Sequence, residues 1–102
     1  MGSIDKSSLK ITPETILQRN DNHISSTIDE EVVILNIDKG MYFNLNEIGT
    51  FIWDILENPC NFESLIAQLV EEYGVNMQDC INDTEPFLLE LIANQIIYVA
   101  HE

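Results

Sequence analysis

The segment EEVVILNIDKGMYFNLNEIGTFIWDIL, residues 30–56, contains a change of hydrophobic periodicity that decides the fold. Its first part, EEVVILNI (30–37), is rich in β-branched residues, and a DKG turn signal separates it from MYFNL (41–45), so we expect two paired strands. After Asn46, a favourable N-cap, apolar residues recur at helical spacing and form one stripe. The members of this stripe are Ile48, Phe51, Ile52, Ile55 and Leu56.

The segment that precedes this hairpin is expected to supply a further strand. TILQRN (15–20) reads as that strand, and DNHISS (21–26) reads as the turn that follows it. Together with 30–37 and 41–45, it would form a three-stranded antiparallel meander.

Two further helices are expected after the first. Asn61 can cap a helix that Gly74 ends as a left-handed residue. The last helix, Met77–Gln95, is expected to be single and kinked at Pro86 rather than to start afresh at Thr84. IIYV (96–99) then closes the chain as an extended segment. The predicted class is therefore α+β, with a three-stranded sheet followed by three helices.

The chain length fits one domain, which we place at residues 13–102 behind a flexible N-terminal tail of residues 1–12. A formal net charge of −14 repels phosphate backbones and anionic lipids, so we expect neither nucleic acid nor membrane as a partner. The last two helices could pass for a helix-turn-helix. However, 77–95 contains no Lys or Arg, which a DNA reader needs.

Enzymatic chemistry has no evident basis in this sequence. Cys60 and Cys80 form no CxxC pair, and His23 and His101 lie near opposite ends of the chain. There is no GxGxxG or Walker motif to hold a phosphate. We therefore expect no catalytic residue, no metal and no cofactor. The two cysteines read as reduced thiols, which predicts a cytoplasmic protein.

Three motifs in a fixed order resemble the PqqD-like family. They are LNxIGxFIWxIL, SLIAQLVEEYGV and DxxxFLxxLxxxxII, and the resemblance spans roughly residues 14–99. The most telling stretches are Leu69–Val75 and Asp83–Leu91. The chain departs from the family at Gln95, where a Gly is usual before the last extended residues. It departs again at Asn58-Pro59, where a Gly often follows the first helix.

The resemblance implies a winged-helix-like fold and a function in ribosomal peptide biosynthesis. Members of the family bind the leader segment of a precursor peptide without acting as enzymes. A stand-alone chain of this size resembles the leader-binding protein of lasso-peptide pathways. That protein works beside a cysteine-protease subunit, which is the leader peptidase, and an ATP-dependent cyclase. One alternative is a PqqD-type chaperone for a radical-SAM enzyme, and another is a subunit that only stabilises a partner enzyme.

The resemblance also implies where the leader would bind. It would add as a strand beside the third strand, formed by Met41, Tyr42, Phe43, Asn44 and Leu45, and lie against the third helix. An edge strand offers unpaired backbone groups, and this one lacks protective prolines and lysines. Either Tyr42 and Asn44 or the apolar set Met41, Phe43 and Leu45 would face the groove.

On the helix, Phe87 and Leu91 are expected to form the floor of the groove, and Asp83 and Glu90 its rim, where they could meet leader lysines. Trp53 falls off the main stripe of its own helix. This position leaves open whether Trp53 packs in the core, lies at the rim of the domain or faces a partner.

Overall fold

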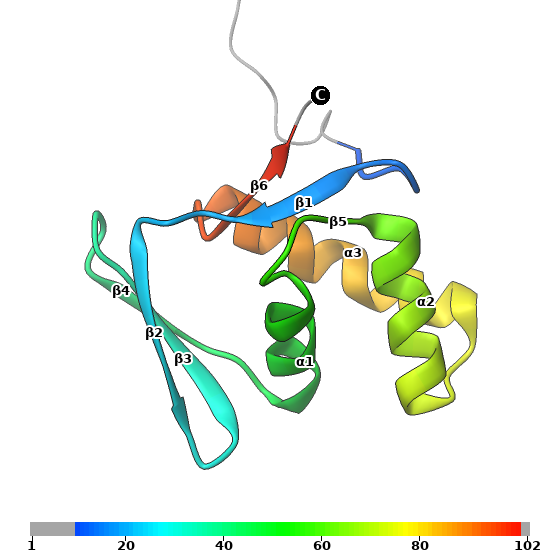
Figure 1. Ribbon diagram of the computed structural model, residues 1–102, viewed down its shortest axis with the longest axis horizontal. Coiled ribbons are helices and arrows are strands. Elements are labelled where there is room, and N and C mark those ends of the chain that lie inside the picture. The colour runs from blue at the N-terminus through cyan, green and yellow to red at the C-terminus, as the bar shows by residue number, and fades with distance from the viewer. Residues whose placement is uncertain (1–9, 101–102) are drawn as a thin grey trace, which may run out of the picture.

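The computed structural model describes residues 10–100 and places two small antiparallel sheets against three helices (Figure 1). The predicted α+β class is confirmed. One sheet has the order β5-β1-β6 and the other the order β2-β3-β4. The strands are β1 (Ile16–Arg19), β2 (His23–Ile28), β3 (Glu31–Asn36), β4 (Met41–Asn44), β5 (Cys60–Asn61) and β6 (Ile97–Ala100). The helices are α1 (Glu47–Ile55), α2 (Phe62–Tyr73) and α3 (Met77–Ala93).

The flexible tail expected for residues 1–12 lies mostly outside the described residues. Ile11 is partly buried and already packs against the core, two residues before the expected start of the domain. No helix between residues 10 and 100 is both long enough and apolar enough to cross a membrane.

The first strand belongs to a different sheet from the one that we predicted. β1 pairs with β5 and with the C-terminal strand β6, where Leu17 lies opposite Val99, and it makes no ladder with the meander. Leu17 is completely buried. A strand at this position covers the core only if the end of the chain returns to pair with it, and local sequence patterns do not reveal such a long-range pairing.

The meander instead begins with β2, which replaces the turn predicted at DNHISS. β2 and β3 are joined by a two-residue turn at Asp29 and Glu30, and both residues have positive φ angles, of 52° and 71°. A type I′ hairpin turn requires this conformation, and sequences usually provide it with Asn-Gly or Asp-Gly. Because neither residue is glycine, the hairpin gives no turn signal in the sequence.

The helix boundaries follow their capping residues as predicted. Asn46 Oδ1 accepts a hydrogen bond from Gly49 N at 2.8 Å, and Asn61 Oδ1 accepts one from Ser64 N at 2.8 Å. Gly74 ends α2 in the left-handed region, with φ 62°. α3 is a single helix with Pro86 inside it, so Thr84 does not start a new helix.

Gln95 occupies a position where the backbone favours glycine. Its φ is 61°, in the left-handed region between α3 and β6. This explains why the family pattern has Gly there, since glycine adopts such a φ without a Cβ clash. The chain keeps the turn despite the substitution.

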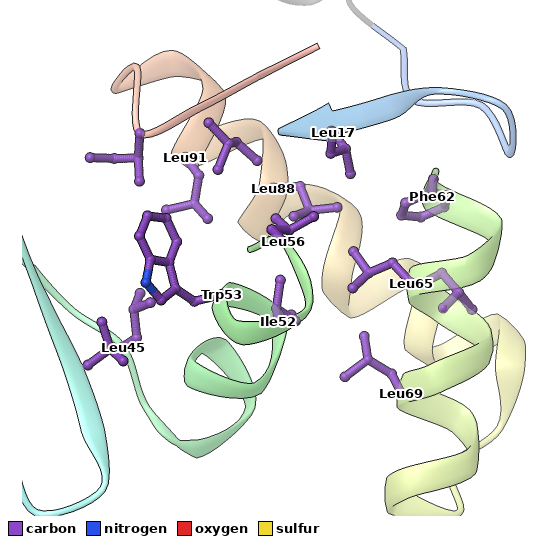
Figure 2. Close-up of a cluster of buried hydrophobic side chains, with 14 of the residues drawn as sticks. Leu17, Leu45, Ile52, Trp53, Leu56, Phe62, Leu65, Leu69, Leu88 and Leu91 are labelled. Atoms are coloured by element: carbon purple, nitrogen blue, oxygen red, sulfur yellow. The ribbon is translucent and has the colours of Figure 1, made fainter. Parts of the chain in front are cut away.

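Trp53 is buried, with 2% of its surface exposed, so it packs in the core and does not lie at the rim. Figure 2 shows its ring between Leu45 and Leu91, inside the cluster of core side chains. The Arg19 guanidinium lies 4.1 Å from the ring centroid, and the His23 ring meets it edge-on at 4.9 Å. Trp53 thus packs toward β1 and the meander, whereas Phe51 of the stripe meets Tyr73 of α2 edge-on at 5.5 Å.

The buried side-chain amide of Asn36 links the meander to the C-terminal end of α3 by a hydrogen bond. The side chain of Asn36, at the end of β3, is 0% exposed, and its Nδ2 donates to the Asn94 carbonyl at 3.0 Å. Its Oδ1 accepts from Lys39 N at 3.1 Å and so holds the turn that leads into β4. One side chain therefore fixes both the β3–β4 turn and the distance of that turn from the C-terminal end of α3.

We predict that Asn36→Ala lowers the free energy of unfolding by about 2 kcal/mol, because it leaves a buried carbonyl and a backbone N–H without their partner. Urea denaturation of both proteins measures the change. Asn58→Ala, at an exposed loop position, is the matched control and should stay within about 0.5 kcal/mol of the parent. Equal losses for the two variants would contradict this role of Asn36.

Candidate functional site

Among residues 10–100, no strand pairs with the outer edge of β4, which therefore presents unpaired backbone groups. Leu45 N donates to Val32 O at 2.8 Å, so these two residues form a hydrogen-bonded pair of the β3–β4 ladder. Such pairs alternate along an antiparallel ladder, so Phe43 and Met41 also point their backbone groups toward β3. The N–H and C=O groups of Tyr42 and Asn44 therefore point outward, away from the sheet.

The side chains of β4 alternate between the two faces of the meander. Phe43 is half-buried and packs against the core, and Leu45, directly after the strand, is buried. Tyr42 and Asn44 are exposed on the opposite face, Tyr42 to 69%. Met41 is on the same side of the strand as Phe43, but it is exposed because it is the first residue of β4. Of the two alternatives, Phe43 and Leu45 are thus the pair turned toward the core.

A cavity of about 320 Å³ lies where the end of β4, the start of α1 and the middle of α3 meet. Asn44 and Leu45 line it from the strand, and Asp83, Thr84 and Phe87 line it from α3. The remaining lining residues are Asn46, Ile48, Gly49 and Ile52. The strand edge and the helix that we predicted as the two sides of one groove do share a cavity.

Gly49 sets the depth of this cavity. A Cβ at position 49 would lie 3.2 Å from Phe87 Cζ and 3.3 Å from Leu45 Cβ, which is tighter than ordinary packing. The missing side chain therefore lets the Phe87 ring lie against α1. In this way the IG pair of the first motif contributes directly to the groove.

A second cavity, of about 370 Å³, continues from the first along α3 toward its N-terminus. The two share Ile48, Asp83 and Thr84 as walls. Beyond these, the lining comes from the end of α2 and from the first turns of α3. It consists of Leu69, Tyr73, Val75, Asn76, Asp79 and Cys80.

The charge along both cavities is negative. Asp83 borders both cavities and Asp79 borders the second, and neither lining includes a Lys or Arg. Partial burial, followed by the nearby carboxylates of Glu47 and Glu72, raises the pKa of the Tyr73 hydroxyl. A cationic group would be attracted to this surface, and an anionic one repelled.

Two of the predicted helix residues do not reach a cavity. Leu91 is 3% exposed within the core and lines neither cavity, while Glu90 is exposed and also lines neither. Substitution of Leu91 would therefore disturb folding before it reported on binding, and Phe87 is the better probe of the groove. Sequence reasoning missed the contributions of Asn46, Ile48, Gly49 and Thr84. Only the IG pair in the family motif pointed toward this region.

The groups that could support catalysis lie apart from the groove or from one another. His23 packs on Trp53, where burial and then the Arg19 charge lower the pKa of its imidazole. Cys80 Sγ lies 3.8 Å from Thr84 Oγ1, and Cys60 is in β5. Within residues 10–100, no cluster of three or more His, Cys, Asp and Glu side chains is placed to hold a metal. His101 lies outside the described residues.

The family described as coenzyme PQQ synthesis protein D (PqqD) matches residues 31–97. The chain belongs to the PqqD family. The match begins at β3 and ends at the start of β6, so it contains β4, α3 and both cavities. It confirms the resemblance that the three sequence motifs indicated.

One solved structure adds a ligand to the comparison. TbiB1 in complex with the TbiA(beta) leader peptide superimposes with a TM-score of 0.75 at 29% sequence identity. The alignment covers 83% of this chain and 99% of TbiB1. A search among curated proteins returned no match. This PqqD-family chain therefore shares its fold with a protein that has been captured with a leader peptide.

We predict that Gly49→Val lowers the free energy of unfolding by about 1–3 kcal/mol, because the added atoms must displace Phe87 or Leu45. Ala67→Val, at an exposed position of α2, is the control and should cost only about 0.5 kcal/mol of helix propensity. Urea denaturation measures both variants. If Gly49→Val is no less stable than Ala67→Val, the close approach of α1 to Phe87 is wrong.

Proposed function

We propose that this protein binds the leader segment of a ribosomally synthesised precursor peptide as an additional strand on β4. The observation that carries the proposal is the open outer edge of β4 beside a cavity walled by α3. The similarity to TbiB1, which has been captured with a leader peptide, supports it. The protein acts by binding and presenting the peptide, without chemistry of its own.

Affinity and specificity come from different parts of the site. The outward N–H and C=O groups of Tyr42 and Asn44 pair with the backbone of the peptide, whatever its sequence. Side chains of an extended peptide alternate, so those on the core side of the added strand point toward the cavity beside Phe87. Asp83 at its rim selects for a nearby basic residue.

The proposal extends to the pathway. We infer that the bound leader is delivered to a separate cysteine-protease subunit, which removes it, and to a separate ATP-dependent cyclase, as in lasso-peptide biosynthesis. The protein would work in the cytoplasm, where ribosomes release the precursor. The open second edge of the meander, at β2, leaves the opposite side of the domain free while a peptide occupies β4.

Asn44→Pro tests strand addition directly. Proline at this position removes an N–H that points away from β3, so the ladder within the domain is retained. We expect affinity for a fluorescently labelled precursor leader peptide to fall at least tenfold, as measured by anisotropy titration. Asn44→Ala, which keeps the N–H, should bind within about threefold of the parent, since an edge side chain of this size contributes little.

Ser25→Pro is the matched control on the other edge of the same sheet. In the β2–β3 ladder, Ile37 N donates to Asn22 O, so the N–H of Ser25 also points outward. This variant should bind the leader normally. Loss of binding in Ser25→Pro with normal binding in Asn44→Pro would place the peptide at β2 and overturn the proposal.

Phe87→Ala and Asp83→Asn separate the apolar and the charged contributions. Phe87→Ala should weaken leader binding about tenfold or more at any salt concentration, because it removes an apolar wall of the cavity. Asp83→Asn should weaken binding less, and its effect should shrink as salt screens the charge. Tyr98→Ala on β6 and Glu63→Gln on α2 are the controls, and thermal melts verify folding. A site elsewhere is indicated if both groove variants bind normally.

A further inference from the structure

The second cavity extends the groove past the end of β4. The Asn36–Asn94 hydrogen bond places the start of β4 near the C-terminal end of α3, and the first cavity places its end near Asp83 and Phe87. β4 and α3 therefore run in opposite directions along the groove. The second cavity continues the same line toward Asp79 and Asn76, at the beginning of α3.

The distance between the cavities suits an extended peptide. Asp83 and Asp79 are one helical turn apart, which is about 6 Å along α3. An extended chain covers this distance in about two residues. A peptide paired with β4 thus reaches the second cavity with the residues two to four positions beyond one end of its paired segment. This is the N-terminal end if the peptide runs antiparallel to β4 and the C-terminal end if it runs parallel.

The walls of the second cavity are mostly apolar, and its rim is acidic. Leu69, Tyr73 and Val75 provide apolar surface, and the adjoining Ile48 is exposed although it is large and hydrophobic. Asp79 lies at one end and Asp83 at the opening that both cavities share. An occupant with an apolar side chain beside a basic residue would match both features.

We propose that the second cavity is an additional recognition site for the same peptide, and that it holds an apolar side chain, flanked by a basic residue, from the segment beyond the strand. This inference rests on the proposed leader-binding function. Its occupant is the peptide itself because the cavity opens into the groove through the shared Ile48, Asp83 and Thr84. A residue bound here would fix how far the peptide slides along β4, which backbone pairing alone leaves open.

Val75→Ser is the main test, because Val75 is exposed, lines the second cavity and does not line the first. We expect it to weaken binding of the full labelled leader about fivefold by reducing the apolar surface that becomes buried. Met77→Ser is the matched control, since Met77 is also exposed and close in sequence but lines neither cavity. Asp79→Asn should weaken binding only at low salt.

Two shortened leaders locate the contact. One lacks residues from its N-terminal end and the other from its C-terminal end. One of these peptides should bind Val75→Ser and the parent equally, because it no longer reaches the second cavity. The other should retain the fivefold difference.

The two cysteines give a second readout on the parent protein. Cys80 lines the second cavity, whereas Cys60 lies in β5 and lines neither. Bound full-length leader should slow iodoacetamide labelling of Cys80, followed by mass spectrometry, without slowing that of Cys60. The leader shortened at the relevant end should not protect Cys80.

The two proposals fail in different ways. If Val75→Ser binds all three peptides as the parent does and Cys80 is not protected, while Asn44→Pro still abolishes binding, the second site is wrong and strand addition stands. If Asn44→Pro also binds normally, the proposed function fails together with the second site.

Discussion

The hydrogen bond from Asn36 to the Asn94 carbonyl sets the spacing on which the rest of the site depends. A strand and a helix cannot form a ladder, so side-chain contacts such as this hydrogen bond define the relative position of the meander and α3. Because the Asn36 side chain is fully buried, breaking this contact would leave two buried polar groups without hydrogen-bond partners. This cost favours the observed spacing of the meander and α3 over slightly shifted ones. Trp53 supports the same junction, because its ring lies between Leu45 and Leu91 (Figure 2). Arg19 Nε donates from β1 to the Trp53 backbone carbonyl at 3.1 Å. β4 is thereby held at a defined position opposite α3.

This defined spacing between β4 and α3 bears on how a peptide could be recognised. A free edge strand pairs with any extended chain, so selectivity requires side-chain pockets at a fixed distance from it. Here the pockets are built by the turn from β4 into α1, where Gly49 lets Phe87 approach, and by the acidic residues of α3. The segment that decides the fold, residues 30–56, therefore also supplies one whole side of the groove.

Local signals were sufficient for the helices but not for the sheets. Asn46, Asn61 and Gly74 act through contacts a few residues away, so the sequence locates their helix ends well. β1 pairs with strands formed some 40 to 80 residues later, and the β2–β3 turn uses Asp29 and Glu30 in a conformation that usually marks glycine. The place of Trp53 stayed open for a similar reason, since its partners come from other elements. The family motifs pointed to β4 and α3, whereas the cavities depend on side-chain packing that no pattern encodes.

The hairpin at Asp29–Glu30 gives the meander a second edge, at β2, with which no other strand pairs within residues 10–100. Two unpaired edges on one small sheet would let copies of the chain stack edge to edge. Exposed Ile24 and Ile28 on β2 add to that tendency. The net charge of −14 opposes such stacking by mutual repulsion at neutral pH. Colloidal stability is therefore tied to ionisation of the carboxylates, and the protein is most prone to self-assembly near its isoelectric point of about 4.1.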